Sequence, residues 1–160
     1  MFLIKLYYHT AALLKTACLS IIYGDRLYWG KKTTYRKGFS LIISKSGKIH
    51  IEKNCFFNNY CSIASNKSIF IGEGTIFGEN VKIYDHNHCY MDSIKPIKEQ
   101  GYASSPIVIG RHCWISSNVV ILKGVTIGDN CVIGASCIVH KNVPSNSILI
   151  NQQQIIMKKM

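Results

Sequence analysis

Aliphatic residues recur along most of this chain at every sixth position. The second half carries six successive hexads, each beginning with an aliphatic residue that is usually followed by a small one. The starting residues are Ile109, Ile115, Ile121, Ile127, Ile133 and Val139. Four positions after each start comes a small or β-branched residue: Cys113, Val119, Val125, Cys131, Cys137 and Val143. Neither an α-helix, with its period of 3.6 residues, nor a simple alternating strand produces this spacing.

An earlier stretch follows the same rule, with one slip of two residues. Its hexads begin at Ile51, Phe57, Ile63, Ile71, Phe77 and Ile83. Such a period predicts a solenoid, in which each hexad forms one side and one corner and three hexads complete a triangular coil. The first residue would point inward, and the small second residue would sit near the corner, where glycine tolerates unusual dihedrals. The predicted fold is therefore an all-β triangular solenoid with one continuous core.

The repeat also accounts for most of the cysteines. Seven are present, and none forms a C-x-x-C pair, which argues against a disulfide framework or a zinc ribbon. Five occupy the small inward position of a hexad, where a free thiol packs as a small hydrophobe: Cys55, Cys61, Cys113, Cys131 and Cys137. No signal peptide with a cleavage site is visible, so we expect reduced thiols in a cytoplasmic protein.

The first 23 residues are apolar but make a poor membrane-spanning helix. Lys5, His9 and Lys15 interrupt them, and charges within such a span are costly. We expect an amphipathic helix that covers one end of the fold or packs against another subunit, with a membrane surface as the third alternative. The predicted organisation is a basic, apolar helical segment (residues 1–35), a β-helix domain (36–150) and a C-terminal tail (151–160).

The formal net charge of +11 is uneven along the chain. Residues 1–53 carry ten Lys and Arg against two acids, so most of the excess lies in the first third. A basic segment of this kind favours an anionic partner, either a membrane surface, an acidic glycan or a nucleic acid, although a merely solvated surface gives the same pattern. No nucleic-acid-binding motif is present, so we expect no nucleic-acid partner.

A polar insertion interrupts the repeat between Ile83 and Ile107. Residues 85–106 begin with Asp-His-Asn-His, and an insertion in a regular solenoid usually serves binding or catalysis. Imidazole can take a proton from a hydroxyl near neutral pH. His86 and His88 would face the same side of a strand, so either could be the general base, and Asp85 could orient one of them.

Two parts of the chain resemble a known family. The run Ile-Gly-Asp-Asn-Cys-Val-Ile-Gly-Ala (residues 127–135) resembles the hexapeptide-repeat transferases, and residues 51–146 are similar to maltose, galactoside and polysaccharide (O-antigen or capsule) O-acetyltransferases. The landmarks are a His that ends a hexad, an extended loop, Pro106, the pattern Ile-Gly-x-x-x-Trp-Ile (109–115) and the final run 124–146. The resemblance implies a left-handed parallel β-helix that forms homotrimers, with active sites between subunits.

The resemblance also implies roles for individual residues. His88 stands at the family's catalytic position and would be the general base of a direct transfer, without a covalent enzyme intermediate. Asn58 and Asn66 stand at acceptor-binding positions, and relatives carry Asp at the second, which leaves the acceptor's identity open. The positions expected to bind the donor are Trp114, Ser117, Ala135, His140, Lys141 and Lys158. The Ser117 N–H would stabilise the oxyanion, and Lys141 would contact phosphate.

Together these features predict an O-acetyltransferase that moves an acetyl group from acetyl-CoA to a sugar hydroxyl in bacterial surface polysaccharide biosynthesis. The basic, apolar lead resembles that of enzymes whose acceptors are often lipid-linked. We therefore expect the protein in the cytoplasm, with peripheral contact at the inner face of the cell membrane. No metal is expected.

Two other functions compete with this one. His86 and His88 form an H-x-H pair, so a β-helix zinc enzyme of the carbonic-anhydrase type would need only a third ligand such as His112 or one from another subunit. A non-catalytic β-helix scaffold would explain the repeat but not the histidine-rich insertion.

Overall fold

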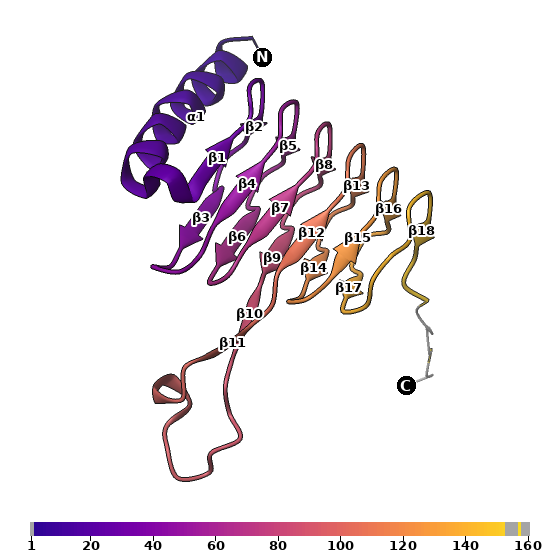
Figure 1. The fold of residues 1–160 in the computed structure, drawn as a ribbon. Coiled ribbons are helices and arrows are strands. Elements are labelled where there is room, and N and C mark those ends of the chain that lie inside the picture. Colours follow the sequence, from indigo (N-terminus) through magenta and orange to yellow (C-terminus); the bar gives the residue numbers. More distant parts are fainter. Residues whose placement is uncertain (1, 153–156, 158–160) are drawn as a thin grey trace.

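The computed structural model describes residues 2–152 and 157, without the side chains of residues 2–6, 8 and 9. Helix α1 (Phe2–Tyr23) is followed by a short 3-10 helix, η1 (Gly24–Arg26), and then by a solenoid of short strands (Figure 1). Each turn of the solenoid, which we call a coil, passes through three parallel sheets that enclose the core. The parallel β-helix with one helical segment and one extended loop is confirmed.

The three sheets contain the following strands. Sheet A holds β1 (Leu27–Trp29), β4 (Ile49–Ile51), β7 (Ile69–Ile71), β12 (Ile107–Ile109) and β15 (Thr126–Ile127). Sheet B holds β2 (Thr34–Tyr35), β5 (Phe56–Phe57), β8 (Ile76–Phe77), β13 (Trp114–Ile115), β16 (Val132–Ile133) and β18 (Ile148–Leu149). Sheet C holds β3 (Ser40–Ile43), β6 (Ser62–Ser65), β9 (Lys82–Tyr84), β14 (Val120–Ile121) and β17 (Ile138–Val139). We name each corner by the sheets it joins: the A–B, B–C and C–A edges.

Equivalent positions of successive coils lie one above the other. Ile71 pairs with Ile51 on one side and with Ile109 on the other, although Ile109 lies 38 positions after Ile71 in the sequence. The inward residues form continuous columns, and the Phe57 and Phe77 rings stack with their centroids 4.5 Å apart. All five cysteines predicted to be inward are buried. The Cys55 thiol, for example, donates a hydrogen bond to the carbonyl of Gly72 on the next coil at 3.2 Å, and burial raises its pKa.

The repeat glycines do not have the role that the sequence suggested. The second-position glycines do not adopt positive φ; that conformation falls two residues later, mostly on asparagines such as Asn54 (φ 61°) and Asn118 (φ 60°). The glycines are needed because the next coil passes too close for a side chain. A Cβ on Gly72 would lie 2.6 Å from the carbonyl carbon of Gly110. The expectation about corner dihedrals was therefore wrong for this position, and close coil stacking is the physical reason.

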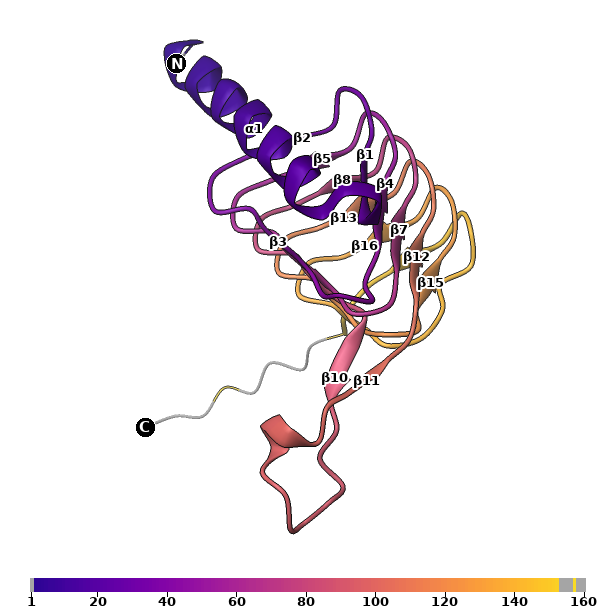
Figure 2. The same ribbon diagram turned by 60° about the vertical axis from the view of Figure 1, so that its left-hand side comes forward.

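Helix α1 lies across the N-terminal end of the solenoid, as Figure 2 shows. It packs against β1 and β2, and its Ala12 carbonyl accepts a hydrogen bond from the Tyr35 hydroxyl at 2.9 Å. The expectation that this segment covers one end of the fold is confirmed. The solenoid itself begins at Leu27, because β1 pairs with β4, so the first coil starts before the predicted boundary at residue 36.

The outer side of α1 remains apolar. Leu14 is 71% exposed and Ile21 is 83% exposed. Among the described residues, no helix is both long enough and apolar enough to cross a membrane.

The insertion leaves the solenoid at the C–A edge without disturbing it. Residues 85–106 contain the antiparallel strands β10 (His86–His88) and β11 (Tyr102–Ser104) and the 3-10 helix η2 (Ile97–Glu99). The flanking strands β9 and β12 still pair within sheets C and A. The hairpin therefore projects from the body as an arm, with its base at the edge (Figure 1).

Candidate active site

The base of the hairpin brings both candidate histidines to one aromatic ring. In the β10–β11 register, His86 lies opposite Ser104 and His88 lies opposite Tyr102. The Tyr102 ring contacts both imidazoles, with centroid distances of 5.2 Å to His86 and 4.5 Å to His88. The prediction that the two histidines share one side of a strand is confirmed. Tyr102 was not foreseen, because the register of a long-looped hairpin has no signature in the sequence.

Asp85 anchors the hairpin to the preceding coil. Its carboxylate is fully buried. It accepts hydrogen bonds from the Ser65 hydroxyl (2.7 Å) and from the backbone N–H groups of Asn66 (2.7 Å) and Lys67 (2.8 Å). Burial by itself would raise the pKa of Asp85, but these hydrogen bonds and that of His86 hold the pKa below its usual range. Asp85 is therefore an ionised structural anchor.

Asp85 orients His86 and not His88. The Nδ1 of His86 lies 3.0 Å from Oδ1 of Asp85, so Nδ1 carries the hydrogen and Nε2 is left as the acceptor of the neutral ring. The His86 side chain is only 19% exposed. His88 is exposed, and its ring contacts the Tyr102 ring. Within the described residues, no hydrogen bond orients the His88 imidazole. The two histidines therefore differ: one is held and partly buried, and the other is accessible.

An open cleft of about 420 Å³ lies beside the hairpin at the C–A edge. It is lined by Ser44, Lys45, Ser46, Asn66, Tyr102 and Ser104. Two coils and strand β11 thus contribute to it. Asn66, one of the predicted acceptor-binding residues, is part of its wall. The sequence did not single out Lys45, because nothing in the hexad pattern marks which corner lies below an insertion.

The other predicted site residues fall into two groups. His140 and Lys141 are exposed at the C–A edge, in the last full coil, on the same edge as the hairpin. Asn58, Ser117 and Ala135 lie at the B–C edge, and Trp114 is half exposed on the outer face of sheet B. Lys158 lies outside the described residues.

The two groups lie on opposite sides of sheet C. Within the described residues, the N–H of Ser117 makes no hydrogen bond, and its hydroxyl accepts one from the Glu79 N–H at 3.2 Å. Asn58 accepts hydrogen bonds from Arg36 and from the N–H of Asn59. A single chain does not bring these groups to the histidines, so a shared site needs a second copy.

The third ligand suggested for a zinc site is not near the histidine pair. His112 sits at the A–B edge, at a corner position with φ of 55°, whereas His86 and His88 project from the C–A edge. Among the described residues, no group of three His, Cys, Asp or Glu side chains is arranged to hold a metal ion. The carbonic-anhydrase interpretation therefore has no ligand set within the described part of one chain.

Comparison with known proteins agrees with this architecture. Residues 106–141 match the family model of the bacterial transferase hexapeptide (six repeats). The chain is 29% identical to the putative lipopolysaccharide biosynthesis O-acetyl transferase WbbJ of Escherichia coli K12, over 98% of this chain and 83% of that protein. A hexapeptide-repeat containing acetyltransferase from Vibrio cholerae superposes with a TM-score of 0.69 at 28% identity, over 82% of this chain and 72% of that one. The chain belongs to the hexapeptide-repeat transferase family.

Two galactoside enzymes extend the comparison to shorter overlaps. The galactoside O-acetyltransferase of Escherichia coli K12 is 38% identical over 66% of this chain, which spans about half (51%) of that protein. A galactoside acetyltransferase in complex with coenzyme A gives a TM-score of 0.58 at 31% identity, covering 73% of this chain and 61% of that one.

The anchor at Asp85 can be tested through the dependence of stability on pH. Asp85→Asn should lower stability at pH 7 by about 2–4 kcal/mol, because an amide cannot accept all the hydrogen bonds of the buried carboxylate. A carboxylate whose pKa is lower in the folded protein than in the unfolded one stabilises the fold at pH values above its unfolded-state pKa. This stabilisation is lost as the pH falls through the folded-state pKa. The gap in thermal midpoint between wild type and variant should therefore shrink as pH drops below about 4. Asp25→Asn, at an exposed residue of η1, is the control and should change little. A gap for Asp85→Asn that stays constant with pH would contradict the assignment.

Proposed function

We propose that this chain is an acetyl-CoA-dependent O-acetyltransferase whose acceptor is a sugar hydroxyl in bacterial surface polysaccharide biosynthesis. The observation that carries the proposal is the histidine hairpin inserted at one edge of a hexapeptide solenoid, beside an open polar cleft. The relatives support the same function: one is the putative lipopolysaccharide biosynthesis O-acetyl transferase WbbJ, and another is a galactoside acetyltransferase in complex with coenzyme A.

We propose His88 as the general base, with direct transfer. It takes the proton of the acceptor hydroxyl while the oxygen bonds to the thioester carbonyl carbon. The tetrahedral intermediate then breaks its C–S bond, and the departing sulfur recovers the proton from the imidazolium. His88 is favoured over His86 because it is exposed, whereas the His86 ring is partly buried and tied to Asp85. In this proposal His86 and Asp85 position the strand that carries the base.

The donor would run along the C-terminal coils. The N–H of Ser117, which makes no hydrogen bond within the described residues, would donate to the oxyanion of the intermediate. A preorganised donor there lowers the activation free energy by about 3–4 kcal/mol. Trp114 and Ala135 would border the thioester and the pantetheine arm, and His140 and Lys141 would lie toward the phosphates. Asn58 and Asn66 would serve the acceptor.

We further propose that the active site is shared between copies of a homotrimer. The support is the separation described above: Ser117 and Ala135 lie at the B–C edge, whereas His88 projects from the C–A edge. A closed ring of three chains would place the C–A edge of one copy against the B–C edge of the next.

The helix supports a proposal about location as well. We propose that α1 rests on an anionic membrane surface from the cytoplasmic side. Its outer face is apolar, and Arg26, Lys31, Lys32, Arg36 and Lys37 all lie within or next to the first coil that it covers. Apolar burial combined with cationic residues is the usual basis of peripheral binding.

The base assignment predicts a clear difference between two variants. With acetyl-CoA and a panel of sugars, nucleotide sugars and lipid-linked glycans, His88→Ala should reduce thiol release by about 10²–10⁴-fold. His86→Ala should cost less activity and also lower the thermal midpoint, since it loses the Asp85 contact. His112→Asn, which keeps a residue that tolerates positive φ, is the control and should retain activity. If His86→Ala alone is inactive, the base is His86; if wild type releases no thiol with any acceptor, the transferase proposal fails.

The shared site predicts complementation between two inactive variants. His88→Ala removes the base, and Ala135→Trp should block the pantetheine arm. If the site takes these residues from different chains, co-expressed differently tagged variants should recover about a quarter of wild-type activity by random mixing in a closed trimer. Mixed assemblies with no activity would show that both residues serve one site from the same chain. Light scattering should give the mass of three chains.

The membrane proposal predicts binding to anionic vesicles. Wild type should sediment with phosphatidylglycerol vesicles and remain free of neutral ones. The double variant Leu14→Asn/Ile21→Asn should lose this binding, because it makes the outer face of α1 polar. Ile94→Asn, at an exposed apolar residue of the hairpin loop, is the matched control and should bind like wild type. Unchanged sedimentation of the helix variant would contradict the proposal.

A further inference from the structure

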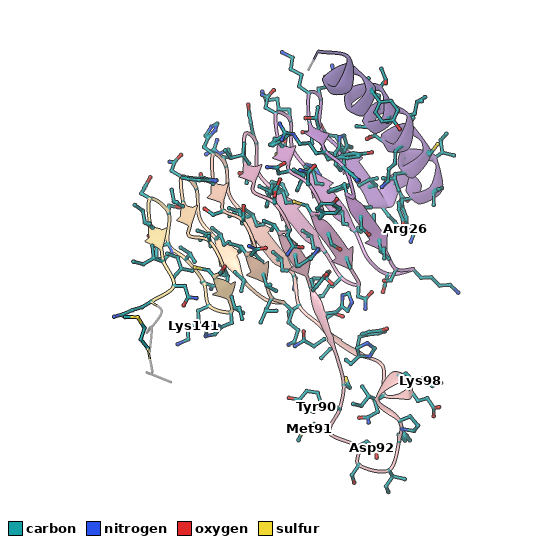
Figure 3. All side chains as sticks on the ribbon, turned by 180° about the vertical axis from the view of Figure 1, so that it is seen from behind. Arg26, Tyr90, Met91, Asp92, Lys98 and Lys141 are labelled. Carbon is teal, nitrogen blue, oxygen red and sulfur yellow. The ribbon has the colours of Figure 1, made fainter. Side chains whose placement is uncertain are left out.

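The C–A edge is cationic on both sides of the hairpin. On the donor side it carries Lys123 and Lys141, and on the other side it carries three lysines of the first two coils: Lys45, Lys48 and Lys67. Figure 3 shows Arg26 and Lys141 toward the two ends of this face of the molecule, with the hairpin between them. The donor-side cations have a place in the proposed function, whereas Lys45, Lys48 and Lys67, which we call the N-terminal lysine cluster, have none.

The N-terminal lysine cluster is unpaired, in contrast to the cations of another edge. At the A–B edge, Lys53 lies 3.3 Å from Glu73 and Arg111 lies 3.1 Å from Asp129. Within the described part of the chain, none of the three cluster lysines forms an ion pair, although all three are exposed. Asp85, which accepts the Lys67 N–H, has a buried carboxylate that is already engaged by hydrogen bonds. The cluster therefore offers uncompensated positive charge.

The backbone beneath the cluster is held firmly. The Arg26 guanidinium donates a hydrogen bond to the Ser44 carbonyl at 2.7 Å, and the Ser46 hydroxyl donates one to the Asn66 carbonyl at 3.0 Å. The Lys48 N–H donates to the Lys67 carbonyl at 3.1 Å, and the Lys67 N–H donates to Asp85. Two successive corners are thus tied to each other and to the root of the hairpin, which fixes the positions from which the lysines reach out.

The cluster is continuous with the candidate active site. Lys45 and Asn66 line the same cleft as Tyr102, whose ring contacts His88. Strands of a sheet lie about 4.8 Å apart, so the first coil, which carries Lys45, is about 10 Å from the third coil, where the hairpin leaves. A group bound by Lys45 could therefore belong to the same molecule as a hydroxyl at His88.

We propose that the acceptor is a sugar carrying a phosphate or diphosphate group, and that the N-terminal lysine cluster binds that group. This inference rests on the proposed acetyltransferase function and names its substrate class. Lysine is a compact point charge suited to phosphate, and the other cleft residues supply hydroxyls and an amide rather than the forked guanidinium that matches a lone carboxylate. Three uncompensated cations also suit a group of more than one negative charge. Nucleotide-linked and polyprenyl-linked sugars share this chemistry.

The test compares two double variants of the full-length protein. Lys45→Gln/Lys67→Gln removes charge from the cluster, and Lys53→Gln/Arg111→Gln removes the same charge from the A–B edge. Acceptors are uridine-diphosphate hexoses, polyprenyl-diphosphate hexoses, hexuronic acids and neutral methyl hexosides. The cluster variant should raise KM for diphosphate acceptors at least tenfold, with kcat and the KM for acetyl-CoA unchanged. The control variant should match wild type. Whichever diphosphate acceptor has the higher kcat/KM identifies the source of the group.

Three results would overturn the proposal. They are equal kcat/KM for neutral and diphosphate hexosides, a loss confined to hexuronic acids, or a cluster variant that behaves like the control. Calorimetric binding of the uridine-diphosphate hexoses separates this inference from the transferase function. Cluster-dependent binding without any thiol release would support the phosphate site and contradict the transferase function. Acetylation of neutral sugars alone would support the transferase function and contradict the phosphate site.

Discussion

Stacking of one coil directly on the next is the interaction on which the rest of the structure depends. Every strand of the solenoid body finds its hydrogen-bond partners on neighbouring coils, and no coil has a core of its own. This constraint explains the glycines, because a Cβ at Gly72 would meet the backbone of Gly110. It also explains the inward thiols, which are small enough for the corner and donate to a carbonyl of the adjacent coil. At the N-terminal end, where no coil follows, α1 covers the first one.

The same constraint decides how chemistry can be added. The stacked sheets admit no internal change, so the insertion leaves at an edge, between strands whose registers continue on either side. Its root then has to be fixed from outside the repeat. Asp85 does this by accepting hydrogen bonds from the N–H groups of the corner on the preceding coil. The buried charge would be destabilising without this set of hydrogen bonds. His86 is held by that anchor, and His88, two residues on, is left accessible.

A prism with three edges also divides the functional residues. The hairpin, the cleft and the unpaired lysines lie on the C–A edge, whereas Asn58, Ser117 and Ala135 lie on the B–C edge. Residues equally spaced along the repeat therefore end up on different corners, and side chains far apart in sequence, such as Lys45 and Tyr102, become neighbours. In the proposed trimer, assembly and catalysis would be linked, because the residues assigned to the base and to the donor lie on different edges of one chain. Charge follows the same division, with ion pairs on the A–B edge and uncompensated lysines beside the hairpin.

The hexad period by itself determined the solenoid, the inward columns, the buried cysteines and the place of the insertion, because each depends only on residues at short, regular spacing. The Asp-His-Asn-His run likewise supplied two candidate bases from local sequence, and the choice of His88 between them came from the family resemblance. Which histidine Asp85 holds, the contact of Tyr102 with both rings and the inclusion of Lys45 in the cleft were decided only by tertiary structure. They depend on hairpin register and on which corner lies beneath the insertion, and neither of these leaves a periodic trace in a sequence.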